Sequence, residues 1–229
     1  MLLNRSKWMR IQELQKGTHV MSRIHKPLED IIVYLLYDLE FVGADHISIM
    51  TYILAFATAY LMLIGNLPLA LLIAFLVGIL DGVDGKIARL RQKKTLIGKL
   101  EHSFDMLYEQ AWYASFTVLC WMSTGNILLL ALGLVWLILD SYVRHIYHIV
   151  WITTGKSLKY HSGIAELITK IDGRRSVYVL HMIIWFLLSK LVPQLCSYTY
   201  AIYTILGHCF FTALSYTIIS FRILHRGES

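Results

Sequence analysis

Long uncharged, mostly apolar stretches dominate the chain. Residues 46–80, 110–139 and 191–221 contain no Asp, Glu, Lys or Arg, and these stretches are 35, 30 and 31 residues long. A helix needs only about 20 apolar residues to cross the hydrocarbon core of a bilayer. The first two stretches each have room for most of two helices, so the pattern predicts a protein that crosses a membrane several times.

Turn residues divide these stretches into six predicted membrane-spanning helices. Gly65-Asn66 ends the first, Pro68 lies at the start of the second, and residues 123–126 form a polar turn between the third and the fourth. The predicted spans cover 46–65, 67–90, 97–122, 127–152, 176–194 and 198–221. We therefore expect an all-α integral membrane protein with six transmembrane helices.

A shorter segment ahead of the spans has the pattern of a surface helix. Within residues 27–40, apolar residues recur at helical spacing, and the acidic residues lie at other positions. The apolar residues are Leu28, Ile31, Ile32, Leu35 and Leu36. Such an amphipathic helix lies in the plane of the membrane surface. The expected organisation is an N-terminal segment (1–44) containing this helix, a six-helix membrane domain (45–222) and a short tail (223–229).

Basic residues indicate the orientation in the membrane. The N-terminal region, the connection between spans two and three, the linker after span four and the tail together contain 19 of the 21 Lys and Arg residues. Six spans place all four regions on one face, and basic loops stay in the cytoplasm. Both termini are therefore predicted to be cytoplasmic, and a prokaryotic cell membrane is the expected location.

Composition supports this class and excludes others. Apolar residues make up 57% of the chain, charged residues only 16%, and the mean hydropathy is +0.58. Soluble domains are nearer 25% charged, so an ordinary soluble enzyme is excluded. The net charge of +6 is explained by topology and by attraction to anionic headgroups. We expect no nucleic-acid partner.

Four acidic residues are spaced to converge at one end of spans two and three. Asp81 and Asp84 are three residues apart and share a helix face, and Glu101 and Asp105 share a face of the next helix. The short connection makes these helices antiparallel neighbours, so the four carboxylates meet at the cytoplasmic end. Unpaired acids near a bilayer are costly.

A divalent cation would relieve this repulsion. All-oxygen ligands suit a hard ion, either Mg²⁺ or Mn²⁺. Gly85 and Ala88 leave space beside the acids for a wide ligand to approach the backbone. Arg89 offers a guanidinium fork for phosphate oxygens. Together these residues predict a site for a diphosphate.

The run from Asp81 to Asp105 resembles the signature of the CDP-alcohol phosphotransferase (CDP-alcohol phosphatidyltransferase) family, Asp-x2-Asp-Gly-x2-Ala-Arg-x8-Gly-x3-Asp-x3-Asp. Asp81, Asp84, Gly85, Ala88, Arg89 and Gly98 match it at the family's spacing. Read strictly, the last two acids fall at His102 and Met106. Glu101 and Asp105 keep the four-residue step one position earlier, and an alignment on Asp105 and Glu109 is the alternative.

A weaker match lies upstream, where Ala44-Asp45-His46-Ile47-Ser48 resembles the family's Pro-Asn-x-x-Thr. The resemblance implies transfer of a substituted phosphate from a CDP-alcohol to an acceptor alcohol with release of CMP, in phospholipid biosynthesis, by a homodimer in which donor or acceptor is a lipid. It implies metal ligands at Asp81, Asp84, Glu101 and Asp105, and Asp105 also as the base. It assigns the cytidine diphosphate to Gly85, Ala88, Arg89, Asp45 and Ser48.

Two other functions remain as alternatives. An intramembrane prenyltransferase also uses acid pairs and Mg²⁺, but after Asp140 the chain has only Glu166, Asp172 and Glu228 as acids, none of them paired. A cation transporter would place acids near the middle of the membrane. Arg174 and Arg175, at the start of span five, fit either an acceptor phosphate or a topology anchor.

Overall fold

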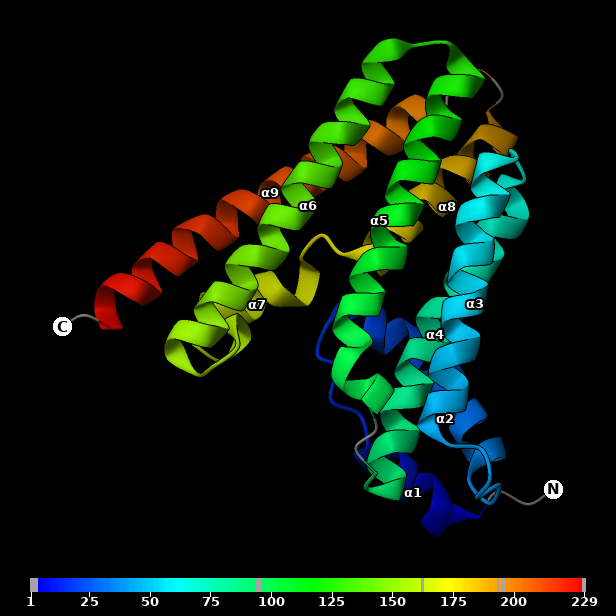
Figure 1. Cartoon of the computed structure of the whole chain (residues 1–229), viewed down its shortest axis with the longest axis vertical. Helices are drawn as coiled ribbons and strands as arrows, with labels where there is room; N and C mark the ends of the chain where they lie inside the picture. The colour runs from blue at the N-terminus through cyan, green and yellow to red at the C-terminus, as the bar shows by residue number, and fades with distance from the viewer. Residues whose placement is uncertain (1–3, 94–95, 162, 193, 195–196, 228–229) are drawn as a thin grey trace. The chain divides into compact units, whose positions relative to one another are not determined.

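The computed structural model describes residues 4–93, 96–161, 163–192, 194 and 197–227, with only the backbone at 96, 226 and 227. Within these residues the chain is helical, with no strand (Figure 1). The helices are α1 (Arg5–Glu13), α2 (Val20–Leu36), α3 (Ala44–Leu63), α4 (Leu67–Arg91), α5 (Leu96–Thr124), α6 (Ile127–Thr154), the 3₁₀ turn η1 (Leu158–Tyr160), α7 (Gly163–Ile171), α8 (Arg175–Leu191) and α9 (Ser197–Gly227).

The chain forms two compact units, and α5 contributes to both. The first unit is Met1–Trp112 and the second is Tyr113–Ser229. All the residues predicted for the site belong to the first unit.

The helices that the sequence predicts are present at all six positions, and the prediction of an all-α protein is confirmed. Four of the described helices, α3, α4, α6 and α9, are long and apolar enough to cross a membrane. Helix α8 has 17 residues, which is about 26 Å of helix at 1.5 Å per residue. That α5 and α8 also cross stays a prediction. Helix α9 continues through the predicted tail to Gly227, and residues 228–229 lie outside the described part.

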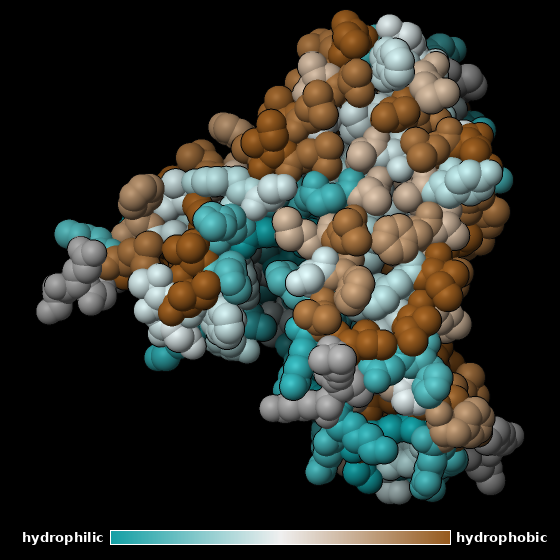
Figure 2. All heavy atoms as spheres, in the orientation of Figure 1, coloured by the Kyte–Doolittle hydropathy of each residue, from teal (hydrophilic) through white to brown (hydrophobic). Residues whose placement is uncertain are grey.

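The core of the first unit lies between α2, α3 and α4. Its buried apolar side chains include Val33 of α2, Ile47 of α3 and Val83 of α4, joined by Ile11 of α1. Asn66 caps α4 by accepting a hydrogen bond from the Leu69 amide, and Pro68 follows in the first turn, where proline is tolerated. In Figure 2, apolar side chains cover much of the visible surface of the long helices, and polar ones gather where α1 lies.

Helix α2 differs in two ways from the predicted surface helix. It begins at Val20 rather than near residue 27, and it includes Pro27 within the helix. Its exposed side is a stripe of large apolar residues, namely Val20, Ile24, Leu28, Ile31 and Leu35. Its two acids, Glu29 and Asp30, are buried against the protein instead. An amphipathic helix is therefore present, but its apolar side faces outward, as a helix resting on lipid requires. Its position on a membrane stays a prediction.

The second unit packs α9 against α6 and α8. Its core joins Val143 and Val150 of α6 to Ala213 and Tyr216 of α9. Helix α6 begins at an Asn126 cap, whose side chain accepts from the Leu128 amide at 3.0 Å, and ends at Gly155 in the left-handed region. A turn is present between α5 and α6 as predicted, but it is shorter than residues 123–126, because α5 continues to Thr124.

Candidate active site

Three of the four predicted acids come together in the first unit. Asp81 of α4 and Glu101 and Asp105 of α5 each offer a carboxylate oxygen, and these oxygens lie within 4.8 Å of one another. All three side chains are partly buried. The spacing within each helix and the short connection between the helices explain this convergence.

Aromatic packing positions the first turns of α5. The ring of Phe104 lies against Tyr52 of α3, with 5.1 Å between centroids. Tyr52 also contacts Tyr108, and Trp112 donates from Nε1 to the Ala55 carbonyl oxygen at 2.6 Å. These contacts recur on one side of α5 at helical spacing. They fix α5 on α3. Because Asp105 follows Phe104 directly, this packing also sets the position of Asp105.

The fourth predicted acid, Asp84, is held from α3. The Ser48 hydroxyl donates to Asp84 Oδ2 at 2.7 Å, and both residues are buried. The other carboxylate oxygen, Oδ1, is buried with no hydrogen-bond partner of normal geometry in the described residues. A buried, unsatisfied carboxylate oxygen is costly unless a ligand completes its contacts. Asp84 is not one of the three clustered acids, but it shares a face of α4 with Asp81.

A cavity of about 570 Å³ opens next to these acids. Its lining includes Ser48 and Asp84, and Glu101 belongs both to this lining and to the carboxylate cluster. The rest of the lining is Ala44, Gly85, Ala88, Arg89, Gln92, Lys93, Gly98 and Lys99. Four of the five residues predicted for the nucleotide therefore face one cavity, whose volume lies in the range of small-molecule sites.

The fifth residue predicted for the nucleotide, Asp45, does not line this cavity. It lies in the first turn of α3, between Ala44 and Ser48, which do line the cavity. Its Oδ1 is buried without a hydrogen-bond partner in the described residues. Asp45 is thus next to the cavity wall rather than part of it.

Arg89 is held in place by the N-terminal segment. Its Nε donates to the Leu14 carbonyl oxygen at 2.8 Å. The guanidinium end lies over Gly85, where an added Cβ would be only 3.2 Å from Nη1. Gly85 therefore leaves room both for the arginine and for whatever enters the cavity.

The geometry bears on the two alternative alignments of the last acid pair. Glu101 and Asp105 converge with Asp81. Glu109 is a buried residue one turn further along α5 and lies outside that three-residue group of the described chain. Met106, where the strict signature expects the last acid, is exposed. The arrangement favours Glu101 and Asp105.

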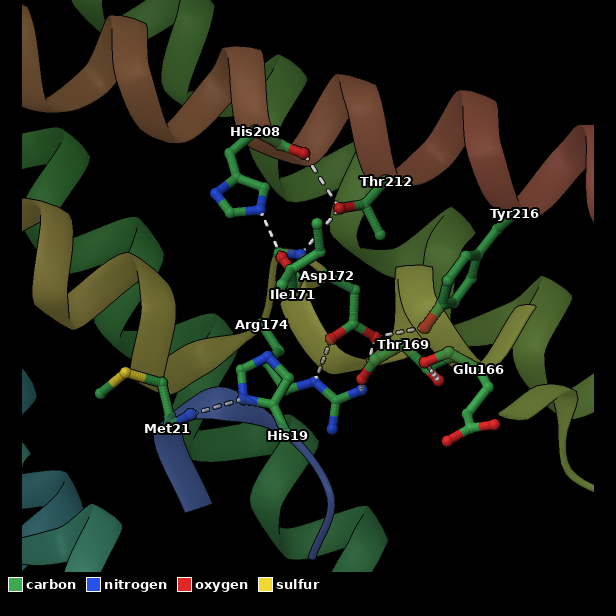
Figure 3. Close-up of polar contacts among 11 residues, drawn as sticks. His19, Met21, Glu166, Thr169, Ile171, Asp172, Arg174, His208, Thr212 and Tyr216 are labelled. Atoms are coloured by element: carbon green, nitrogen blue, oxygen red, sulfur yellow. Dashed lines mark hydrogen bonds and ion pairs between the residues drawn. The ribbon is translucent and has the colours of Figure 1, made fainter. Parts of the chain in front are cut away.

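Arg174 belongs to a polar cluster of the second unit (Figure 3). Its Nε donates to Asp172 Oδ1 at 2.7 Å, and the Tyr216 hydroxyl donates to the same carboxylate. Beside them the Gly173 amide donates to the Thr212 hydroxyl oxygen at 2.7 Å. The charge of Asp172 and its hydrogen bond hold the pKa of Arg174 above its ordinary value. Asp172 and Gly173 therefore tie the connection before α8 to α9, and Arg174 pairs with the Asp172 carboxylate.

Three charged residues behind the site were not predicted to act together. Glu29 and Asp30 of α2 meet Lys86, which the sequence places in the signature between Gly85 and Ala88. The only signal in the sequence was the pair of adjacent acids in an otherwise apolar surface helix.

The sequence profile of the CDP-alcohol phosphatidyltransferase family matches residues 41–219, which is most of the chain. No individual curated protein matches the sequence. The chain therefore belongs to the CDP-alcohol phosphatidyltransferase family, whose members transfer a phosphatidyl group from a CDP-alcohol and generally depend on a divalent metal. With its four apolar helices, this membership makes it an integral membrane transferase.

Proposed function

We propose that this protein transfers a substituted phosphate from a CDP-alcohol to the hydroxyl of an acceptor alcohol and releases CMP, as a step of phospholipid biosynthesis. The observation that carries the proposal is the position of Glu101, which belongs both to the three-carboxylate group and to the wall of the cavity. A charged diphosphate entering that cavity would meet the carboxylate group. The same observation, with the family, disfavours a prenyltransferase or a transporter.

The donor set fits a hard divalent cation, Mg²⁺ or Mn²⁺. Asp81, Glu101 and Asp105 supply only carboxylate oxygens within 4.8 Å of one another, and the buried, unsatisfied Oδ1 of Asp84 would add a fourth carboxylate oxygen. When bound, such a cation neutralises the charge on the diphosphate and on the departing CMP.

The remaining chemistry needs few groups. Arg89 binds diphosphate oxygens, while Gly85 and Ala88 let the diphosphate approach the backbone of α4. Asp105 accepts the proton of the acceptor hydroxyl while the oxygen of that hydroxyl attacks the donor's phosphorus. The bond from that phosphorus to the oxygen bridging to CMP then breaks, and CMP leaves with this oxygen. Phosphoryl transfer depends mainly on such positioning and charge.

The family and the apolar helices support a lipid as donor or acceptor and a site near the membrane surface. We also propose that the carboxylates and both termini face the cytoplasm, and that the protein works as a homodimer. The distribution of Lys and Arg supports the orientation. The dimer rests on the family resemblance alone.

The test is a CMP-release assay with the purified full-length protein. CDP-diacylglycerol is offered with glycerol 3-phosphate, inositol or serine, and CDP-choline or CDP-ethanolamine is offered with diacylglycerol, each with and without Mg²⁺. We expect metal-dependent CMP release in at least one combination and none from Asp81→Asn. CMP release that persists in the Asp81→Asn variant would contradict the proposed site.

A further inference from the structure

A buried group of charges lies behind the carboxylates, between α2 and α4. Lys86 Nζ lies 2.8 Å from Glu29 Oε2 and 2.6 Å from Asp30 Oδ1. The exposed fractions are 1% for Lys86, 3% for Glu29 and 1% for Asp30. Charges this deeply buried are retained only when they are paired. The pairing here joins the surface helix to the helix that carries Asp81 and Asp84.

The backbone of α4 is shaped to receive these side chains. A Cβ on Gly82 would lie 2.3 Å from the Glu29 carboxylate, and one on Gly78 would lie 2.8 Å from the His25 ring. Gly78 and Gly82 are four residues apart, as are His25 and Glu29, so two matching helix turns meet. The glycines let α2 approach α4 closely enough for the ion pairs to form.

Within α4, Lys86 lies on the side away from Asp84. Lys86 follows Asp84 by two residues, and at about 100° per residue that places the two side chains on nearly opposite sides of the helix. Asp84, Gly85 and Ala88 line the cavity, whereas Gly82 and Lys86 contact α2. Rotation of α4 about its axis would therefore move Asp81 and Asp84 and break the ion pairs together.

The charges within the group balance. Lys26 of α2 also contacts Asp30, at 2.7 Å from Oδ2, and Gln12 of α1 donates to the same oxygen at 2.6 Å. Burial raises the pKa of Glu29, and the hydrogen bond and charge of Lys86 oppose that rise. Lys86 is thus the partner that favours the charged form of Glu29.

We propose that Glu29, Asp30 and Lys86 are positioning residues of the metal site: they fix the rotation of α4 on the surface helix and thereby hold Asp81 and Asp84 toward the cavity. The inference rests on the proposed function, because the cation and the reaction are those of the proposed transferase. None of the three residues touches the substrate or the cation in this account. Their effect passes through the backbone of α4.

The experiment measures Mn²⁺ binding by the full-length protein in detergent, from the loss of the free-ion signal in electron paramagnetic resonance. Glu29→Gln keeps the side-chain volume and removes the charge, and Lys86→Met removes the central cation. We expect each substitution to weaken Mn²⁺ binding about 10-fold. This is the lower end of the effect of removing a residue that orients metal ligands. Lys26→Met is the matched control. It breaks the ion pair between Lys26 and Asp30, which is similar in length to the pair between Lys86 and Asp30, and it leaves α4 unchanged. It should bind Mn²⁺ as the wild type does.

Thermal unfolding without metal accompanies each titration, so that affinity is compared only among folded proteins. If Lys86→Met does not fold, Glu29→Gln decides. Wild-type Mn²⁺ affinity in folded Glu29→Gln would overturn the proposal. An equal loss in Lys26→Met would also overturn it, since the effect would then be one of net charge. If wild type binds Mn²⁺ and the variants lose affinity as expected, but no CMP is released, only the proposed function fails.

Discussion

At the residue scale, Gly85 leaves room for both the Arg89 guanidinium and a ligand in the cavity. Its missing side chain leaves room for the Arg89 guanidinium, and the same position lines the cavity. Arg89 in turn is fixed by the Leu14 carbonyl, so it has little freedom to move away from a new side chain. A larger residue at position 85 therefore disturbs both the arginine and the ligand.

We expect Gly85→Leu to abolish binding of a CDP-alcohol while the protein still folds. The leucine would displace Arg89 and fill the cavity wall. Isothermal titration with the CDP-alcohol in detergent measures the loss, and CMP release should fall in parallel. Gly207→Leu on α9 is the control, because a Cβ there meets no atom within 4 Å. Unchanged binding by Gly85→Leu would show that the diphosphate does not approach α4 at this point.

Asp105 and Glu101 are expected to differ in their effects on rate and on metal affinity. Asp105→Asn keeps the shape of the side chain but cannot accept the acceptor's proton, and removal of a general base costs about 10²–10⁴-fold in rate. Extra Mg²⁺ should not restore that loss. Glu101→Gln should mainly weaken metal binding, so high Mg²⁺ should restore part of its activity. CMP release measured against Mg²⁺ concentration separates the two.

Met106→Ala and Glu109→Gln complete this series as tests of the alignment. Met106 is exposed, and its replacement should be mild. If Asp105→Asn stays near wild type at saturating Mg²⁺ while Glu109→Gln is inactive, the acid pair is Asp105 and Glu109, and Glu101 lies outside the site.

The sequence predicts local clustering of side chains better than long-range pairing. The clustering of Asp81, Glu101 and Asp105 could be predicted, because helical spacing and the short connection between the two helices determine which side chains lie close together. Lys86 and Asp30 are 56 residues apart, and no periodicity relates them. The same holds for Arg89 and the carbonyl of Leu14, since a backbone acceptor leaves no trace in residue type.

At the element scale, α2 shows why a pattern of apolar positions is ambiguous. Spacing indicates that one side of the helix is apolar, but it does not say which side contacts the protein. Here the buried side includes His25, Glu29 and Asp30, and much of the apolar side is exposed. In water this arrangement would be unfavourable, and on a lipid surface it is favourable. The pairing of Glu29 and Asp30 with Lys86 is what allows the acids to face inward.

Gly82→Ala tests the contact between α2 and α4. The added Cβ would lie 2.3 Å from the Glu29 carboxylate, which cannot move away without leaving Lys86. Overpacking of this kind costs about 1–3 kcal/mol, so the temperature of thermal unfolding should fall. Gly207→Ala, in open space on α9, should leave it unchanged or raise it, because alanine is the better helix former by about 1 kcal/mol. Equal unfolding temperatures for Gly82→Ala and wild type would argue against close packing of the helices here.

At the scale of the whole molecule, the helix count follows from the sequence more readily than the number of membrane crossings. Gly, Pro and Asn mark helix ends by their backbone preferences, so the six long apolar or mixed helices fall where turn residues predict them. Crossing depends also on length and on the solvent around each helix. Helix α8 is short, at 17 residues, and α5 begins with the acids of the site. The charge distribution therefore provides an independent indication of how many helices cross.

The charge distribution makes a definite prediction about which loops face outward. Six crossings put the basic N-terminal region, the two basic connections and the tail on the cytoplasmic side, and put residues 123–126 outside. Ser123 is exposed at the end of α5, so Ser123→Cys in a background without the native cysteines should react with a membrane-impermeant maleimide added to intact cells. Epitope tags at either terminus should be reached only after the membrane is permeabilised. If only α3, α4, α6 and α9 crossed, α5 and residues 123–126 would stay cytoplasmic, and α8 would lie on the outer face. Protection of Ser123→Cys in intact cells, with both terminal tags also protected, would reject the six-crossing arrangement. Protection of Ser123→Cys with the terminal tags accessible would reverse the predicted orientation and place the carboxylates on the outer face.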